Sequence, residues 1–172
     1  MLEACKSGET KIVQLLLYRC NSEESGLNIK DEFEMTPLMW ACVIGHKDVV
    51  QLLLDHSERI ELNARSNTGW TACMKACYYG HKDVVELLLD HSERIELNAR
   101  SNLGRTAFMY ACQKGHSDVV KLLLDHSERI ELNARDNFGN TGFLCACQNG
   151  NRDVVKLLSE VKDVDITWNF QF

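Results

Sequence analysis

Cysteine and histidine recur together at a fixed spacing, and this pair of residue types can do chemistry. Three cysteines are each followed by a histidine four positions later: Cys42 and His46, Cys77 and His81, Cys112 and His116. A thiol beside an imidazole is the arrangement of a nucleophile with its general base. A glycine that predicts the end of a helix separates the two members of each pair, however, and no third group that would orient the histidine repeats in phase. We therefore expect a structural role for these pairs and no catalytic residue.

The same residue types could ligate zinc. All six histidines fall at two register positions: His46, His81 and His116 at one, and His56, His91 and His126 at the other. Equivalent positions of stacked units lie about 8–10 Å apart, too far to share an ion whose ligands lie at about 2.0–2.3 Å. The pairs Cys73–Cys77 and Cys145–Cys147 lack a second pair at zinc-finger spacing. We expect no metal site and no cofactor.

These residues belong to a repeat. The tract DVVxLLLDHSERIELNAR begins at Asp48, Asp83 and Asp118, so the period is 35 residues. Shorter copies begin at Asp153 (DVVKLLSE) and at Lys11 (KIVQLLL). A period in this range predicts an array in which each unit buries a face against the next.

The cysteines fit the array better than they fit a disulfide framework. Five of the eight follow an alanine at one register position: Cys5, Cys42, Cys77, Cys112 and Cys147. Equivalent positions are too far apart to bridge, because a disulfide needs Cα atoms within roughly 7 Å. We expect free thiols, with Cys20, Cys73 and Cys145 also unpaired, and hence a reducing compartment. The cytoplasm is the first expectation and the nucleus the alternative.

Composition and charge exclude other classes of protein. The net charge is −6, whereas nucleic-acid binding requires a basic face. The apolar runs are far shorter than the ~20 residues of a membrane-spanning helix, and the N-terminal residues Met1 to Lys6 lack the apolar stretch of a signal peptide. We expect a monomer that does not insert into a membrane.

Each unit is predicted to hold two helices and a long turn. Thr36 and Pro37 suit the cap and first position of a helix, and Thr71, Thr106 and Thr141 repeat the cap. Glycines predicted to end this helix are Gly45, Gly80, Gly115 and Gly150. The second helix has the apolar face Val49, Val50, Leu52, Leu53 and Leu54. A segment from Ser57 to Trp70 follows, with the composition of an extended stretch and a β-turn.

One pattern runs from Asp31 to Arg65 and returns in the later units. It comprises Asp31, Thr36-Pro37-Leu38, Ala41-Cys42, Gly45-His46, the triple leucine and Asn63-Ala64-Arg65. This pattern resembles the ankyrin repeat. The resemblance covers a partial unit at 1–30, full units at 31–65, 66–100 and 101–135, and a terminal unit at 136–172, here called the first to fifth units. It implies one all-α domain, an ankyrin-repeat solenoid of stacked helix-turn-helix units with projecting β-hairpin-like loops. It also implies a non-enzymatic module that binds a protein or peptide on its concave face.

The sequence departs from the family in three respects. The usual histidine after Thr-Pro-Leu is replaced by Met39, Met74, Met109 and Leu144, which removes a hydrogen bond to the cap threonine. Each full unit is two residues longer than the usual ~33, which predicts a different exit from the second helix. The two ends are irregular: no threonine caps the first helix, and the chain finishes with Trp168, Phe170 and Phe172. Each end is either a degenerate cap or a cut through a longer protein.

Comparison of the units with one another separates scaffold from candidate binding residues. The second helix and its exit hardly vary, whereas the turn tip and the first helix do. The resemblance places these variable columns on the concave face, and we expect the following partner-binding residues: Phe33, Met35, Val43, Ile44, Thr68, Trp70, Lys75, Tyr78, Tyr79, Leu103, Arg105, Gln113, Lys114, Phe138 and Asn140. We expect Met35, Val43, Ile44, Trp70, Tyr78 and Tyr79 to form an exposed apolar patch, whereas Trp40 and Tyr110 fill gaps between helices.

A cationic column completes the candidate surface, with Arg65 and Arg100 as its candidate binding residues. The column comprises Lys30, Arg65, Arg100 and Arg135. Either these cations face an acidic peptide beside the aromatic patch, or each pairs with Asp31, Asp136 or a neighbouring loop carboxylate. Two alternatives to a binding scaffold remain: a regulatory fragment of a larger enzyme, channel or effector, and an engineered array.

Overall fold

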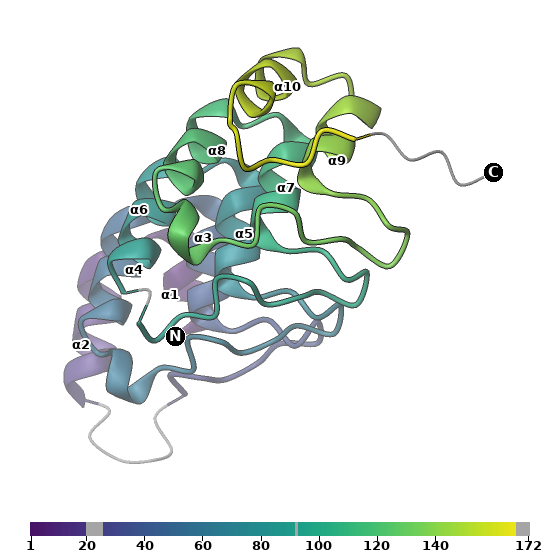
Figure 1. Ribbon diagram of the computed structural model, residues 1–172. Helices are drawn as coiled ribbons and strands as arrows, with labels where there is room; N and C mark the ends of the chain where they lie inside the picture. The colour runs from purple at the N-terminus through teal and green to yellow at the C-terminus, as the bar shows by residue number, and fades with distance from the viewer. Residues whose placement is uncertain (20–25, 92, 168–172) are drawn as a thin grey trace.

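The chain is a stack of helix pairs. The computed structural model describes residues 1–19, 26–91 and 93–167. One layer holds the first helix of each unit: α1 (Leu2–Ser7), α3 (Pro37–Ile44), α5 (Ala72–Tyr79), α7 (Ala107–Lys114) and α9 (Gly142–Gln148). The other holds the second helices: α2 (Thr10–Arg19), α4 (Lys47–Leu54), α6 (Lys82–Asp90), α8 (Ser117–Leu124) and α10 (Arg152–Ser159). The connecting loops project together from one side of the stack (Figure 1). The predicted all-α solenoid is confirmed.

Local sequence sets the limits of the first helices. Met39 N–H donates to Thr36 Oγ1 across 3.3 Å, and Thr71, Thr106 and Thr141 cap their helices in the same way. The threonine cap is therefore satisfied by backbone although the family's histidine is absent. Gly45 ends α3 with φ 85°, and a Cβ there would lie 2.5 Å from His81 Nδ1. Both the left-handed backbone and the packing of the next unit require glycine at this position.

The core runs the length of the stack between the two layers. Each first helix packs against the first helix of the next unit, and each second helix does the same. The repeated valines and leucines of the second helices belong to this core; Val85 and Leu88, for example, are almost fully buried. The repeated tract is therefore scaffold, as its constancy predicted.

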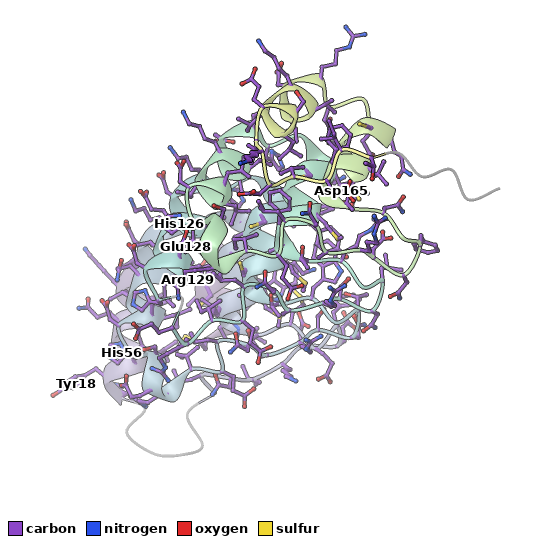
Figure 2. The ribbon with its side chains drawn as sticks, viewed as in Figure 1. Tyr18, His56, His126, Glu128, Arg129 and Asp165 are labelled. Carbon is purple, nitrogen blue, oxygen red and sulfur yellow. The ribbon has the colours of Figure 1, made fainter. Side chains whose placement is uncertain are left out.

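Both histidine registers make structural hydrogen bonds. His81 Nε2 lies 2.9 Å from the carbonyl oxygen of Val43, at the end of the preceding unit's first helix, and His46 and His116 bond in the same way to Lys6 and Tyr78. Because the acceptor is a carbonyl, Nε2 carries the proton. In the other register, His56 and His126 bond their own helix through Nδ1; Figure 2 shows them two units apart on the side of the second helices. The histidines hold units together and end helices.

The long exit from the second helix is a repeated hydrogen-bonded element. Two 3-10 turns, η1 (Ser57–Arg59) and η2 (Ser127–Arg129), lie between the triple leucine and the Leu-Asn-Ala sequence of their units, where each unit carries its two extra residues. Beyond them an asparagine of one unit holds the next: Asn63 Nδ2 donates to the carbonyl of Arg94, and its Oδ1 accepts from Glu96 N–H, both at 2.9 Å. Asn28, Asn98 and Asn133 repeat both bonds.

The projecting loops end in stacked turns. Each tip is closed by two backbone bonds, such as Ser66 N–H to the Trp70 carbonyl at 3.0 Å and Gly69 N–H to the Ser66 carbonyl at 2.8 Å. Neighbouring tips are joined by a third, such as Asn102 N–H to the Thr68 carbonyl at 3.1 Å. The described residues form no β-strand, so the hairpin-like character lies in these turns. Glu34 adopts φ 58° where the next three units have glycine.

Candidate protein-binding surface

The turn tips and the exposed side of the first helices form one surface, which we call the inner face. It contains most of the residues singled out from the sequence. Large apolar side chains are exposed at three tips and at two helix ends: Phe33, Leu103 and Phe138, then Ile44 and Tyr79. Thr68 occupies the remaining tip and is exposed. The amount of exposed apolar surface on this face marks it as a candidate interaction site.

Four members of the predicted exposed patch need correction, because Met35 is buried and Val43, Trp70 and Tyr78 are half-buried against the core. Met35 is only 4% exposed, so the prediction that it belongs to an exposed patch is wrong. Asp31 Oδ1 accepts its backbone N–H at 2.9 Å, and its side chain belongs to the apolar core. Trp70 and Tyr78 are half-buried and pack against that core, so they form the base of the surface more than its exterior. Tyr110 is buried, as predicted.

Four aromatic rings form one cluster across the third and fourth units. The ring of Trp70 lies 4.0 Å from that of Tyr110 and 4.9 Å from that of Tyr78, between centroids. Tyr79 meets Tyr78 edge-on at 5.1 Å. Tilted and edge-to-face contacts at these distances are favourable for aromatic pairs. The cluster is rigid and partly exposed, which suits a surface that anchors a partner.

A depression opens between the second and third units. With the aromatic cluster and with Leu103 and Lys114 beside it, the depression forms what we call the open half of the inner face. Its volume is about 240 Å³, and it is lined by Phe33, Met35, Trp40, Val43, Ser66, Asn67, Thr68, Lys75 and Tyr79. Six of these residues were singled out from the sequence. The depression is large enough for one or two side chains of another molecule and too small for a typical drug-sized ligand.

Lysines lie over the aromatic rings of this face. Lys75 Nζ is 4.5 Å from the ring centroid of Trp70, and Lys114 Nζ is 4.4 Å from that of Tyr78. Burial lowers the pKa of Lys75, and the charge of Asp31 opposes that effect. The negative faces of the rings stabilise both ammonium groups while leaving part of each group accessible.

A polar network in the fourth and fifth units forms what we call the closed half, because its side chains bind one another: Arg105, Gln113, Asp136, Asn140 and Gln148. Arg105 Nε donates to Asp136 Oδ2 at 2.9 Å, and its Nη1 donates to Gln113 Oε1 at 3.1 Å. Asn140 donates to the same carboxylate and accepts from Gln148. The Asp136 side chain is fully buried in this network. Arg105, Gln113 and Asn140 were expected to face a partner, but here their polar groups are already bonded.

The Asp136 carboxylate is held ionised by its neighbours. Burial by itself raises the pKa of Asp136, but the hydrogen bonds from Arg105 and from the backbone N–H groups of Asn140 and Phe138 outweigh burial. The pKa therefore lies below its ordinary value. The ion pair with Arg105 is consequently intact at neutral pH.

The arginine column bonds to the protein itself. Arg65 Nη1 donates to the carbonyl of Arg100 at 2.6 Å, and Arg100 Nη1 donates to the carbonyl of Arg135 at 2.7 Å. Arg100 also pairs with Glu131, and Arg135 with Asp165. Of the two sequence-based alternatives, the structure favours internal pairing. Most of the acceptors are backbone carbonyls one unit further along, which the sequence pattern did not indicate.

The cysteine–histidine pairs lack the properties of a nucleophile and its base. Burial raises the pKa of Cys42 and Cys112 well above the ordinary value, and that of Cys5 and Cys145 to about 11. Such thiols are protonated at neutral pH, whereas the thiolate is the reactive form. The seven cysteines in the described part of the chain are free thiols; Cys20 and the aromatic residues of the C-terminal end lie outside it.

Metal binding requires a cluster of ligand side chains, and membrane insertion requires a long apolar helix. Residues 1–19, 26–91 and 93–167 contain no group of three or more histidine, cysteine or acidic residues that could hold a metal ion. No helix within those ranges has the length and apolar character needed to cross a bilayer.

Sequence reasoning missed three residues of the depression, namely Trp40, Ser66 and Asn67. Trp40 was assigned to the helix gap because it shares a column with Tyr110, yet it remains partly exposed, and its Nε1 donates to Asp31 Oδ2 at 2.8 Å. The residue nine positions earlier could have indicated this difference. Asp31 gives the Trp40 indole a hydrogen-bond partner at the edge of the depression. At the equivalent position, the Ser101 hydroxyl bonds the buried Tyr110 at 2.9 Å.

Comparison with known families agrees with the geometry. The family model described as ankyrin repeats in three copies matches residues 1–101 and again residues 93–168. Together the two matches span almost the whole chain, including every helix of both layers. The stacked helix pairs, threonine caps and projecting turns are therefore those of a known repeat, and the chain belongs to the ankyrin repeat family.

Proposed function

We propose that the five units act as one domain that binds another protein through the open half of the inner face, without chemistry of its own. Ankyrin repeats are in general protein–protein interaction modules and are typically non-enzymatic. The contacts proposed for the partner come from the second, third and fourth units: Phe33, Val43, Ile44, Thr68, Lys75, Tyr79, Leu103 and Lys114. The reducing interior of a cell is the proposed location, because the free thiols need no oxidising compartment.

One observation carries this proposal: the depression between the second and third units, with exposed Phe33 and Tyr79 in its lining. Neither large side chain is needed to fill the core, since Phe33 is 53% exposed and Tyr79 47%. Residues that vary between otherwise identical units, and that leave apolar surface in water, are free to serve recognition. Burying such anchors in a partner supplies most of the binding energy of a typical interface.

The test compares three forms of the protein as bait in lysate of the cells that express it: wild type, Tyr79→Ala and Glu86→Ala. Glu86 is exposed on α6, on the side of the second helices. We expect the wild type and Glu86→Ala to retain the same proteins from the lysate, and Tyr79→Ala to lose them. Thermal unfolding should show that all three forms of the bait are folded. Equal retention by the Tyr79 variant would show that binding does not use this surface.

A further inference from the structure

The charges of the inner face differ in sign from those of the whole protein. The net charge of the chain is −6, yet segments 66–80 and 101–115, which form the tips and first helices of the third and fourth units, contain no acidic residue. Their charged residues are Lys75, Arg105 and Lys114. Arg105 is neutralised by Asp136 of the fifth unit. Two lysines, Lys75 and Lys114, therefore supply the remaining positive charge of these segments.

Neither lysine forms a salt bridge with a described carboxylate, although the charge of Asp31 acts on Lys75 from a greater distance. Within the described part of the chain, no carboxylate oxygen lies within 4.0 Å of the Nζ of Lys75 or Lys114. Both ammonium groups rest on rings of one cluster, because Trp70 and Tyr78 are themselves in contact. Lys6 lies over Trp40 in the same manner, but it is paired with Glu3 at 3.0 Å. An ammonium group that lies on an aromatic ring and lacks an anion can accept one from a partner.

The acids nearest to the depression belong to the tip of the second unit, and two of them already have partners. Asp31 accepts hydrogen bonds from Trp40 and from two backbone N–H groups, and Glu34 pairs with Lys30 at 3.1 Å. With Glu32, these acids make the tip of the second unit negative. The inner face is thus negative at the second unit and positive across the third and fourth, which favours one direction for an extended chain bound along it.

We propose, on the basis of the proposed function, that the partner presents an acidic segment with a large apolar side chain. The apolar side chain enters the depression between the second and third units, and carboxylates on one side of it contact Lys75 and Lys114. A peptide fits better than a phosphate-rich ligand, because Arg65, Arg100, Arg105 and Arg135, which could grip phosphate with two hydrogen bonds, already bond to the protein.

The test uses a random peptide library displayed on phage and selected on the immobilised wild-type chain. We expect the enriched peptides to be rich in aspartate or glutamate beside leucine, phenylalanine or tryptophan. The Kd of one enriched peptide, made synthetically, is then measured by fluorescence anisotropy. The double variant Lys75→Gln, Lys114→Gln should raise the Kd about tenfold. For the wild type, an increase in salt concentration from about 50 to about 500 mM should raise the Kd by about the same factor.

The control removes the same charge elsewhere. Lys121→Gln with Lys156→Gln changes two exposed lysines of α8 and α10 and should leave the Kd unchanged. The salt series needs no variant, so it tests the charge contribution even if substitution of Lys75, which lies over Trp70, disturbs folding.

The outcomes separate this inference from the function on which it rests. Enriched peptides that are neutral or basic, no enrichment at all, or an equal loss in the control variant would overturn the acidic partner. Neutral peptides whose binding is abolished by Tyr79→Ala would overturn the acidic segment alone and leave the binding surface in place. Peptides insensitive to Tyr79→Ala would overturn both.

Discussion

The open and closed halves of the inner face use the same register positions for opposite purposes. In the column of Trp70, Arg105 and Asn140, the backbone is equivalent in each unit. In the closed half, Arg105 and Asn140 are tied to the buried carboxylate of Asp136. In the open half, Trp70 forms part of an aromatic cluster with a lysine above it and a depression alongside.

The difference shows how one repeat can be both scaffold and binding surface. Polar groups bonded within the protein add rigidity but offer little to a partner, since binding would have to break those bonds. Half-exposed aromatic rings and unpaired ammonium groups have unused interactions to offer. A substitution in the closed half should therefore cost stability, and one in the open half should cost binding.

The largest effect on stability should come from Asp136→Ala. The substitution leaves the Arg105 guanidinium, whose side chain is 16% exposed, without its partner and removes the acceptor for two backbone N–H groups of the turn. We expect the free energy of unfolding to fall by about 3 kcal/mol, near the lower end for breaking a buried ion pair. Urea unfolding measures it.

The matched control for that change is Asp83→Ala, which removes an exposed acid from the first turn of α6. Its loss should be within about 1 kcal/mol, the usual contribution of a charge at a helix end. Similar losses in the two variants would mean that the closed half is no more tightly held than ordinary surface.

Acid should weaken the closed half. The folded pKa of Asp136 lies below its ordinary value, near 3.9 in an unfolded chain. The unfolded state therefore binds the proton first, and the stabilisation present above about pH 4 is lost as the pH falls through the folded pKa. Urea unfolding from pH 7 to pH 3 should show a shallower decline for Asp136→Asn than for wild type. Parallel curves would show that another group controls the acid limb.

A smaller loss is expected from Trp70→Ala. The indole contacts Tyr110 and Tyr78 but remains half-buried, so its removal should lower the free energy of unfolding by about 2 kcal/mol. Phe33→Ala, at an exposed tip, should stay within about 0.5 kcal/mol of wild type. Thermal and urea unfolding distinguish the two, and equal losses would place Phe33 in the packed base of the surface.

A small effect on stability is also expected from Tyr79→Ala. The exposed ring has edge contact with Tyr78 and lies beside His81 at 6.4 Å. We expect the free energy of unfolding to change by less than about 1 kcal/mol. A loss as large as that of Trp70→Ala would assign Tyr79 to the core and leave the open half without its principal anchor.

The sequence predicted the fold well because the fold depends on repeated local signals. The threonine caps, the helix-ending glycines and the valine and leucine face recur at a 35-residue spacing, and each specifies its element through nearby residues. The constancy of the histidines correctly indicated a structural role, although their acceptors, such as the Val43 carbonyl 38 residues before His81, could not be read from the pattern.

The site was less predictable because the side-chain environment depends on contacts between units. Met35 shares a column with Arg105 and Asn140, and nothing in the sequence indicates that the tip of the second unit turns this side chain into the core. The arginine column was ambiguous for the same reason, because two of its acceptors are carbonyls 35 residues away. Variation between units indicated which face to examine, and only the three-dimensional contacts divided that face into an open and a closed half.

The division of the inner face means that the open half, and not the closed half, should bind the partner. The most direct measurement is the Kd of one captured partner for wild type, Tyr79→Ala and Gln148→Ala, the last being an exposed residue of the closed half. We predict a Kd raised about tenfold or more by Tyr79→Ala and unchanged by Gln148→Ala. Equal weakening by both variants, or weakening by Gln148→Ala alone, would contradict that assignment.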